Sequence, residues 1–190
     1  MRVQIIPVQD VHLLGDALKN APPREAAMVG WLLYCGLRCH EVCALTWHDI
    51  FFGGEITTAV NVKTSHEPDN HPRLVDIPDK LRTLLQQHRA AVMEADPSTS
   101  LRDAVFKSVK HKRQLMNRDL ERICFRITSA ALGKPYNPRT FRHTYATDLM
   151  RRTTIRVVQA LLGHRSLQST QIYTHPTSDD CRQAVADLYK

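Results

Sequence analysis

Residues 139–147 have the sequence Arg-Thr-Phe-Arg-His-Thr-Tyr-Ala-Thr and form the most informative stretch of the chain. Apolar residues recur at helical spacing through this region, which predicts a helix over residues 140–150. Similar clusters occur at residues 36–41, Gly-Leu-Arg-Cys-His-Glu, and at residues 162–166, Leu-Gly-His-Arg-Ser. Each cluster places an Arg or His at or near a helix end, where unpaired backbone N–H groups favour an anion. Two such arginines that converge can hold one phosphate through paired hydrogen bonds.

The rest of the chain is also mostly helical in its pattern. Helical spacing of apolar residues, with Pro and Gly at the ends, predicts helices over residues 8–18, 26–35, 41–45, 80–93, 117–132, 155–162 and 180–189. Two runs rich in β-branched residues, 56–62 and 74–77, flank a polar loop at 66–72 and predict a pair of strands. The predicted fold class is therefore α+β, a mostly helical domain with a small antiparallel sheet inserted after the first helices.

Length and composition favour one folded domain. The 190 residues are 43% hydrophobic and 24% charged, which suits a protein with a real core and argues against disorder. No apolar run approaches the roughly 20 residues that a membrane helix needs, and no signal peptide opens the chain. The five cysteines form no paired framework, so we expect a reducing cytoplasm.

The net charge of +7 is unevenly divided along the chain. Residues 1–100 hold 9 Lys and Arg against 12 Asp and Glu, a net charge of −3, whereas residues 101–190 hold 17 against 7, a net charge of +10. A block of positive charge of this size favours a polyanionic partner, with nucleic acid ahead of a membrane surface.

The clusters together resemble the tyrosine recombinases, also called the phage integrase family. Four family motifs occur in the family's order: Gly36, Arg38, Glu41 and Leu45; then residues 139–147; then residues 162–166; and finally Thr170, Tyr173 and His175. The resemblance runs from about Val8 to the end of the chain. It implies the family's catalytic domain and double-stranded DNA as the partner.

The resemblance also implies a role for each site residue. Arg38 and Arg142 would stabilise the charge that develops on a phosphodiester under attack. Tyr173 would be the nucleophile, forming a covalent 3′-phosphotyrosine that conserves the bond energy without ATP. Because a phenol has an ordinary pKa of about 10, nearby positive charge must help Tyr173 to ionise.

Three further residues complete the implied site. Lys63, at the end of the first predicted strand, would protonate the leaving 5′-oxygen as general acid. His164 would hydrogen-bond a phosphate oxygen, and Glu41 would orient an Arg or His. The scheme requires no metal ion and no cofactor.

The chain departs from the family pattern at Arg139, where the family usually has a histidine. Arginine stays protonated and cannot accept the tyrosine proton. Our hypothesis is that Arg139 keeps the hydrogen-bonding and charge roles of a catalytic residue, while the proton leaves through water or another side chain. The neighbouring His143 is interpreted as no more than a buried, hydrogen-bonded residue.

Two other groups of residues have an ordinary and a functional interpretation. Cys35, Cys39 and Cys43 share one helix face if Gly36 does not break the helix, but they lack the paired Cys-x-x-Cys spacing of zinc sites, so core packing is favoured over a metal. A short basic cluster lies between residues 107 and 113 and is either a solvated loop or a contact with the DNA backbone. Its members are Lys107, Lys110, Lys112 and Arg113. The basic second half of the chain favours the DNA contact.

The predicted function is site-specific recombination, integration or excision, by a single catalytic domain over residues 1–190 that lacks the family's N-terminal clamp domain. We expect a monomer that assembles on DNA, as a tetrameric synapse with the C-terminal helix docked on a neighbouring protomer. Two alternatives stay open at this point: DNA relaxation like that of a type IB topoisomerase, and non-catalytic DNA binding on the same fold.

Overall fold

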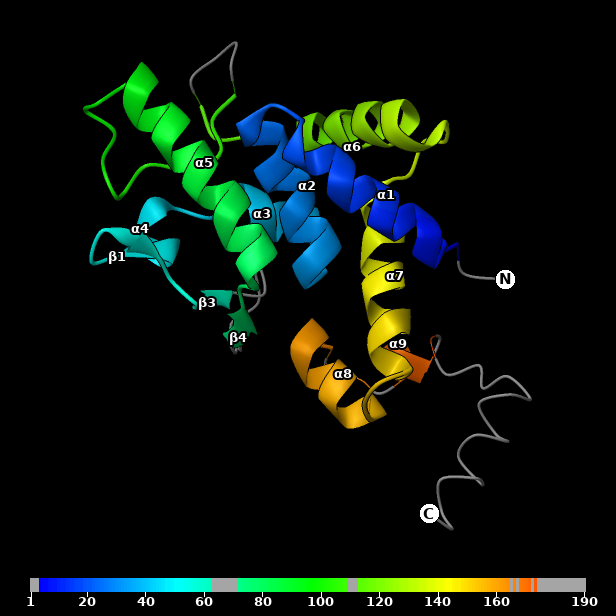
Figure 1. The fold of residues 1–190 in the computed structure, drawn as a ribbon. Helices are drawn as coiled ribbons and strands as arrows, with labels where there is room; N and C mark the ends of the chain where they lie inside the picture. The colour runs from blue at the N-terminus through cyan, green and yellow to red at the C-terminus, as the bar shows by residue number, and fades with distance from the viewer. Residues whose placement is uncertain are drawn as a thin grey trace.

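The computed structural model describes residues 4–62, 72–108, 113–164, 166, 168–171 and 173 (Figure 1). In chain order the elements are α1 Val8–Lys19, α2 Pro23–Cys35, α3 Cys39–Ala44, α4 Trp47–Ile50, β1 Phe51–Phe52, β2 Glu55–Ile56, β3 Ala59–Val62, β4 Arg73–Asp76, α5 Asp79–Ala95, α6 Asn117–Leu132, α7 Pro138–Met150, α8 Ile155–Leu162 and α9 Gln168–Gln171. The mostly helical α+β class is confirmed. The predicted helix over 180–189 lies outside the described residues.

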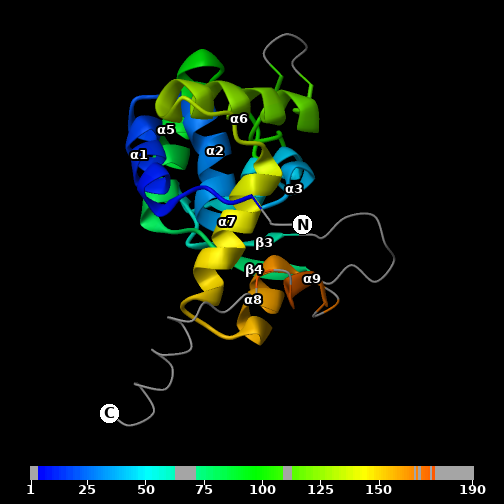
Figure 2. The ribbon, with the colours of Figure 1, turned by 90° about the vertical axis from the view of Figure 1, so that its right-hand side faces the viewer.

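Helix α2 is the centre of the fold, and α1, α3, α5, α6 and α7 pack around it (Figures 1 and 2). Its residues from Ala26 to Leu33 are all buried, as expected of a helix that is apolar on every side. Pro23 stands in the first turn, where a missing N–H costs nothing. Gly36 ends α2 in the left-handed conformation, which directs the chain toward α3.

The strands form two separate antiparallel pairs, β1 with β2 and β3 with β4. The prediction of one continuous strand over 56–62 was wrong, because the backbone N–H of Thr57 turns back to donate to the carbonyl of Ile50 at 2.9 Å. Residues 53–54 are both glycines with positive φ, 61° and 91°, which closes a tight hairpin between β1 and β2. The second pair, β3–β4, matches the two predicted strands, and the loop predicted between them lies, apart from residue 72, outside the described residues.

Helix α7 links the main core to a smaller one. Its first half packs with α2 and α6, while its second half meets α8 at the other end of the molecule (Figures 1 and 2). There Ala146, Val158, Leu162 and Tyr173 form a separate buried cluster. The site residues on α7 therefore stand where the two cores meet.

Two of the three clustered cysteines confirm the core-packing interpretation. Cys35 and Cys43 are buried in the main core, and Cys39 is partly buried against it. Burial raises the pKa of the Cys35 and Cys43 thiols to about 12, so they stay protonated. Among the described residues, none of the helices is long and apolar enough to cross a membrane.

We predict that Gly36→Ala destabilises the protein more than Gly133→Ala does. Both glycines have positive φ, 59° and 65°, which costs a non-glycine residue about 1–2 kcal/mol. A Cβ on Gly36 would lie 2.4 Å from Tyr145 Cδ1, whereas one on Gly133 would meet nothing within 4 Å. Overpacking adds about 1–3 kcal/mol to the cost at Gly36 alone. Urea unfolding of the two variants measures the difference, and equal losses would contradict the close approach.

We also predict a loss of stability at acid pH that depends on His88. The ring is buried and stacked on Phe106, and Nε2 donates to the Val105 carbonyl at 2.9 Å. Burial, with smaller effects of nearby arginines, lowers the His88 pKa from 6.5 to about 4. The unfolded chain protonates His88 more readily than the folded protein does. The contribution of the neutral His88 to the free energy of unfolding is therefore present above pH 6.5 and is lost as the pH falls toward 4.

The expected size of this loss is about 3 kcal/mol between pH 7 and pH 4. His88→Gln keeps an amide donor for the Val105 carbonyl and removes the titration. The free energy of unfolding of this variant should therefore fall less steeply with pH than that of the wild type. If urea unfolding gives the same pH dependence for the wild type and His88→Gln, the loss of stability at acid pH is not due to His88.

Candidate active site

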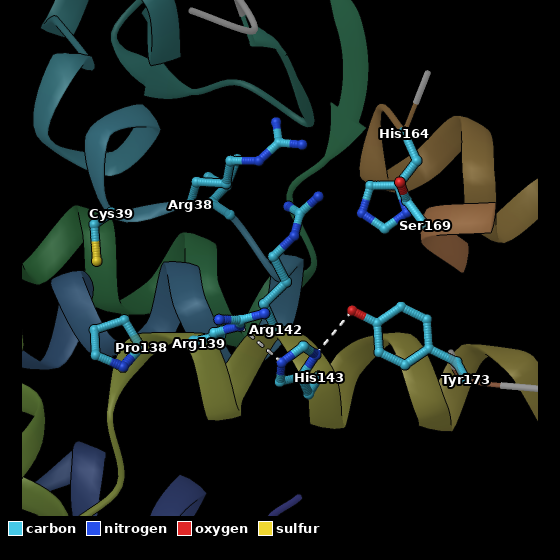
Figure 3. A pocket seen from close by; sticks show the side chains of 10 residues that line it. Arg38, Cys39, Pro138, Arg139, Arg142, His143, His164, Ser169 and Tyr173 are labelled. Atoms are coloured by element: carbon cyan, nitrogen blue, oxygen red, sulfur yellow. Dashed lines mark hydrogen bonds between the residues drawn. The ribbon is translucent and has the colours of Figure 1, made fainter. Parts of the chain in front are cut away.

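The motif residues meet in one cavity of about 470 Å³ (Figure 3). Its walls come from the end of α2, the start of α3, α7 and the segment after α8. The lining residues are Leu37, Arg38, Cys39, Pro138, Arg139, Arg142, His143, His164, Ser169 and Tyr173. Figure 3 shows the Arg38 and Arg142 side chains reaching toward the same space that His164 and the Tyr173 hydroxyl face from the other side. Five of the six predicted catalytic residues are brought together here.

Arg142 is the most buried of the arginines that line the cavity, with only 8% of its surface exposed. It donates from Nη1 to the Gly36 carbonyl at 2.8 Å and from Nη2 to the Leu162 carbonyl at 2.6 Å. Burial, followed by the charge of Arg38, lowers its pKa to about 10, so it remains cationic at neutral pH. Arg142 thus ties the ends of α2 and α8 to α7 and presents its remaining N–H groups to the cavity.

Arg38 is held in place by Glu41, which lies in the first turn of the helix that follows it. It precedes α3, and its backbone N–H donates to Glu41 Oε2 at 2.7 Å while its Nη1 donates to Oε1 at 3.0 Å. Glu41 is almost fully buried, and it also accepts two hydrogen bonds from Arg73, at 2.7 and 2.8 Å. Burial raises the pKa of Glu41, but the arginines more than offset this and leave it below its ordinary value.

Arg73 is a site residue that the sequence reasoning missed. It is buried at the start of β4 and donates from Nε to the Leu161 carbonyl at 2.9 Å, in addition to its pair with Glu41. It therefore connects Glu41 of α3, which also holds Arg38, to the end of α8, just before His164. A signal was available: in a strand with alternating burial, Arg73 shares the inward face with Val75, and a buried arginine requires a carboxylate.

His164 follows the left-handed Gly163 that ends α8. Its Nδ1 lies 2.9 Å from the hydroxyl of Thr170, a fully buried residue of α9. Burial first, and then the surrounding arginines, lower its pKa to about 4. At neutral pH the ring is therefore uncharged, with Nδ1 engaged by Thr170.

The Tyr173 side chain is buried, with its hydroxyl oxygen 2.8 Å from His143 Nδ1. Burial raises the pKa of this phenol, while Arg142, Arg139 and Arg38 act to lower it. The positive charge expected around the tyrosine is present, but burial outweighs it. His143, which the sequence interpretation treated as a plain neighbour, contacts the hydroxyl directly.

Arg139 lies on the exposed side of the cavity and donates from Nε to His143 Nε2 at 3.2 Å. It is one turn ahead of His143 on α7, so both side chains lie on the same face of that helix. Asn137 caps α7 by accepting from the backbone N–H of Thr140 at 2.9 Å, which fixes the start of the helix that carries these residues.

Five other residues were predicted to act in catalysis or to contact DNA. Lys63, Lys110 and Lys112 are outside the described residues. Lys107 is ion-paired with Asp103 at 3.2 Å, and Arg113 is exposed. Both residues precede α6 in the chain, and neither lines the cavity.

The described part of the chain holds no group of three or more His, Cys, Asp or Glu side chains that could bind a metal ion. The cavity is lined instead by arginines, histidines and a tyrosine, an arrangement suited to an oxyanion such as a phosphodiester.

Comparison with known proteins shows the family of this chain. The model of the phage integrase family matches residues 4–179. Tyrosine recombinase XerD of Pseudomonas putida is 33% identical over 167 residues, covering 85% of this chain and 52% of the relative. A tyrosine recombinase of Pseudothermotoga lettingae is 30% identical over 186 residues, covering 97% of this chain and 60% of the relative. The chain thus spans between half and two thirds of the length of these relatives.

Solved structures show the same fold. The crystal structure of XerA recombinase superposes with a TM-score of 0.80 at 24% identity, covering 100% of this chain and 66% of the other. The XerH site-specific recombinase, in a pre-cleavage complex with its difH substrate, gives 0.77 at 19% identity, covering 100% and 55%. With the family match and the four ordered motifs, these findings show that the chain belongs to the phage integrase family, the tyrosine recombinases.

Proposed function

We propose that this chain cleaves and rejoins DNA in site-specific recombination, through a covalent 3′-phosphotyrosine on Tyr173. The observation that carries the proposal is the convergence of Arg38, Arg142, His164 and Tyr173 on one cavity from separate segments of the chain. Three of these side chains donate hydrogen bonds suited to phosphate oxygens, and the fourth is a nucleophile.

In the proposed reaction, a phosphodiester occupies the cavity with its non-bridging oxygens toward the two arginines. Arg142 is already fixed by two backbone carbonyls and Arg38 by Glu41, so both are in place before charge develops. Donors that need no reorganisation stabilise the transition state most effectively. His164 Nε2 supplies a further hydrogen bond.

In the cleavage step, one bond to phosphorus forms and another breaks. The Tyr173 hydroxyl loses its proton to water and its oxygen attacks phosphorus, and the 5′-oxygen of the next nucleotide leaves. We assign the proton for that oxygen to Lys63, which adjoins the last residue of β3, Val62. Attack by a free 5′-hydroxyl from a second duplex reverses the step and completes strand transfer.

Double-stranded DNA is the proposed partner, and the +10 charge of residues 101–190 supports it. The related fold of XerH is seen with its difH substrate. We also propose that copies of the chain assemble on DNA as a tetramer through the C-terminal helix, and that backbone contacts involve Lys107, Lys110, Lys112 and Arg113. Action on intracellular DNA would place the chain in the cytoplasm.

A two-duplex strand-transfer assay tests this function. Labelled nicked duplexes with randomised arms are mixed with unlabelled duplexes, and transferred products are amplified and sequenced. Products that share a sequence around the junction are expected from the wild-type chain and not from Tyr173→Phe. Relaxation of supercoiled plasmid without strand transfer, or binding with neither activity, would refute recombination.

A further inference from the structure

Arg139, His143 and Tyr173 form a line of hydrogen bonds along one side of the cavity (Figure 3). Arg139 Nε donates to His143 Nε2 at 3.2 Å, and His143 Nδ1 lies 2.8 Å from the Tyr173 hydroxyl oxygen. The two residues of α7 are on one helix face, and the line ends on the atom that attacks DNA in the proposed function.

The direction of the second hydrogen bond follows from the first. A guanidinium group only donates, so His143 Nε2 must accept with its lone pair. A neutral imidazole carries one proton, which must then be on Nδ1. His143 therefore donates from Nδ1 to the Tyr173 oxygen, and in this tautomer it cannot take up the phenol proton.

The surroundings hold His143 in the neutral form. Burial lowers its pKa, and the charges of Arg139 and Arg142 lower it further. Protonation of Nε2 would also displace the hydrogen bond from Arg139. The charged and titratable groups that line the cavity together with Tyr173 are Arg38, Cys39, Arg139, Arg142, His143 and His164.

We propose that His143 is a catalytic hydrogen-bond donor that stabilises the Tyr173 phenolate, and that Arg139 is a positioning residue that fixes the His143 tautomer. Naming Tyr173 as the nucleophile rests on the proposed function. A donor to the charged form favours ionisation, and such charge-assisted bonds are about twice as strong as neutral ones. The phenol proton leaves to water. Arg139, which cannot accept a proton, thus still promotes ionisation through the imidazole.

The first test measures the ionisation of residue 173 without DNA. The full chain is made with 3,5-difluorotyrosine in place of Tyr173, which brings the titration to lower pH, and is followed by ¹⁹F NMR. His143→Leu should raise the apparent pKa by about one unit, a tenfold loss in the ionisation constant. His143→Asn should shift it far less, because the amide nitrogen takes the place of Nδ1.

The second test reads the tautomer of His143 by ¹⁵N NMR, with the resonance assigned through its loss in His143→Asn. The wild type should show a neutral ring protonated on Nδ1. Arg139→Met should give a mixture of both neutral tautomers and a pKa at residue 173 between those of wild type and His143→Leu. A role for Arg139 in fold stability alone would not move the tautomer.

Either of two results would overturn the proposal. One is a wild-type His143 that is protonated on Nε2. This result is measured on the wild-type protein, and a variant is needed only to assign the resonance. The other is a His143→Leu variant in which the pKa at residue 173 is unchanged or lowered. Neither test uses DNA, so the two proposals fail separately. The hydrogen bond from His143 can be absent while Tyr173 still cleaves DNA covalently, and it can be present while cleavage does not occur.

Discussion

Replacing Arg142 by lysine is expected to slow DNA cleavage about a hundred- to a thousandfold. Arg142 donates to two carbonyls, of Gly36 and Leu162, that lie on different segments, and still faces the cavity. A lysine has one donor group and cannot span both carbonyls while also meeting a phosphate oxygen. Because lysine keeps the positive charge, the loss of cleavage rate measures the contribution of the planar guanidinium geometry.

Single-turnover cleavage at saturating protein measures this effect, with thermal unfolding as a check on the fold. Arg151→Lys is the matched control, because Arg151 ends the same helix and is exposed, with a 3.6 Å contact to Asp148. The control should cleave like the wild type. An Arg142→Lys rate within threefold of the wild-type rate would contradict the proposed part of Arg142 in the reaction.

Arg73→Met is expected to lower the free energy of unfolding by about 3–5 kcal/mol. The substitution leaves the Glu41 carboxylate buried without its main partner and also removes the hydrogen bond to Leu161. Arg38 and the end of α8 lose a shared anchor, so cleavage should fall with stability. Urea unfolding and the single-turnover assay measure the two effects.

Two further variants serve as a control and a test of the cause for the Arg73→Met result. Arg82→Met removes an ion pair whose partner Asp79 is 94% exposed, and should cost less than about 1 kcal/mol. The double variant Arg73→Met with Glu41→Gln removes the stranded charge and should be more stable than Arg73→Met alone. If the double variant is no better, the uncompensated carboxylate is not the cause of the loss.

The sequence predicted the long helices and most of the site, because the signals for both are local. Helical spacing and the glycines after α2, α6 and α8 set the helix ends to within a few residues. The motifs named Arg38, Arg142, His164 and Tyr173 before any geometry was known. Short elements such as α4 and α9, four residues each, were not predicted because four residues carry too little periodicity.

What the sequence could not supply were contacts between distant segments. Arg73 is 32 positions from Glu41 and 88 from Leu161, so no local pattern pairs them. The role of His143 was also hidden, since its importance depends on the hydroxyl of Tyr173, 30 positions away. The net effect on the Tyr173 pKa was out of reach as well, because it depends on how deeply the ring is buried.

The most direct test of the account is covalent capture of DNA by Tyr173. Nicked duplexes from which the short 5′-hydroxyl fragment is lost after cleavage are incubated with the wild-type chain and with Tyr173→Phe, and adducts are separated under denaturing conditions. The account predicts an adduct in the wild type alone, with a 3′-phosphate linked to the peptide that contains Tyr173. An adduct that persists in Tyr173→Phe, or that maps to another residue, would contradict it.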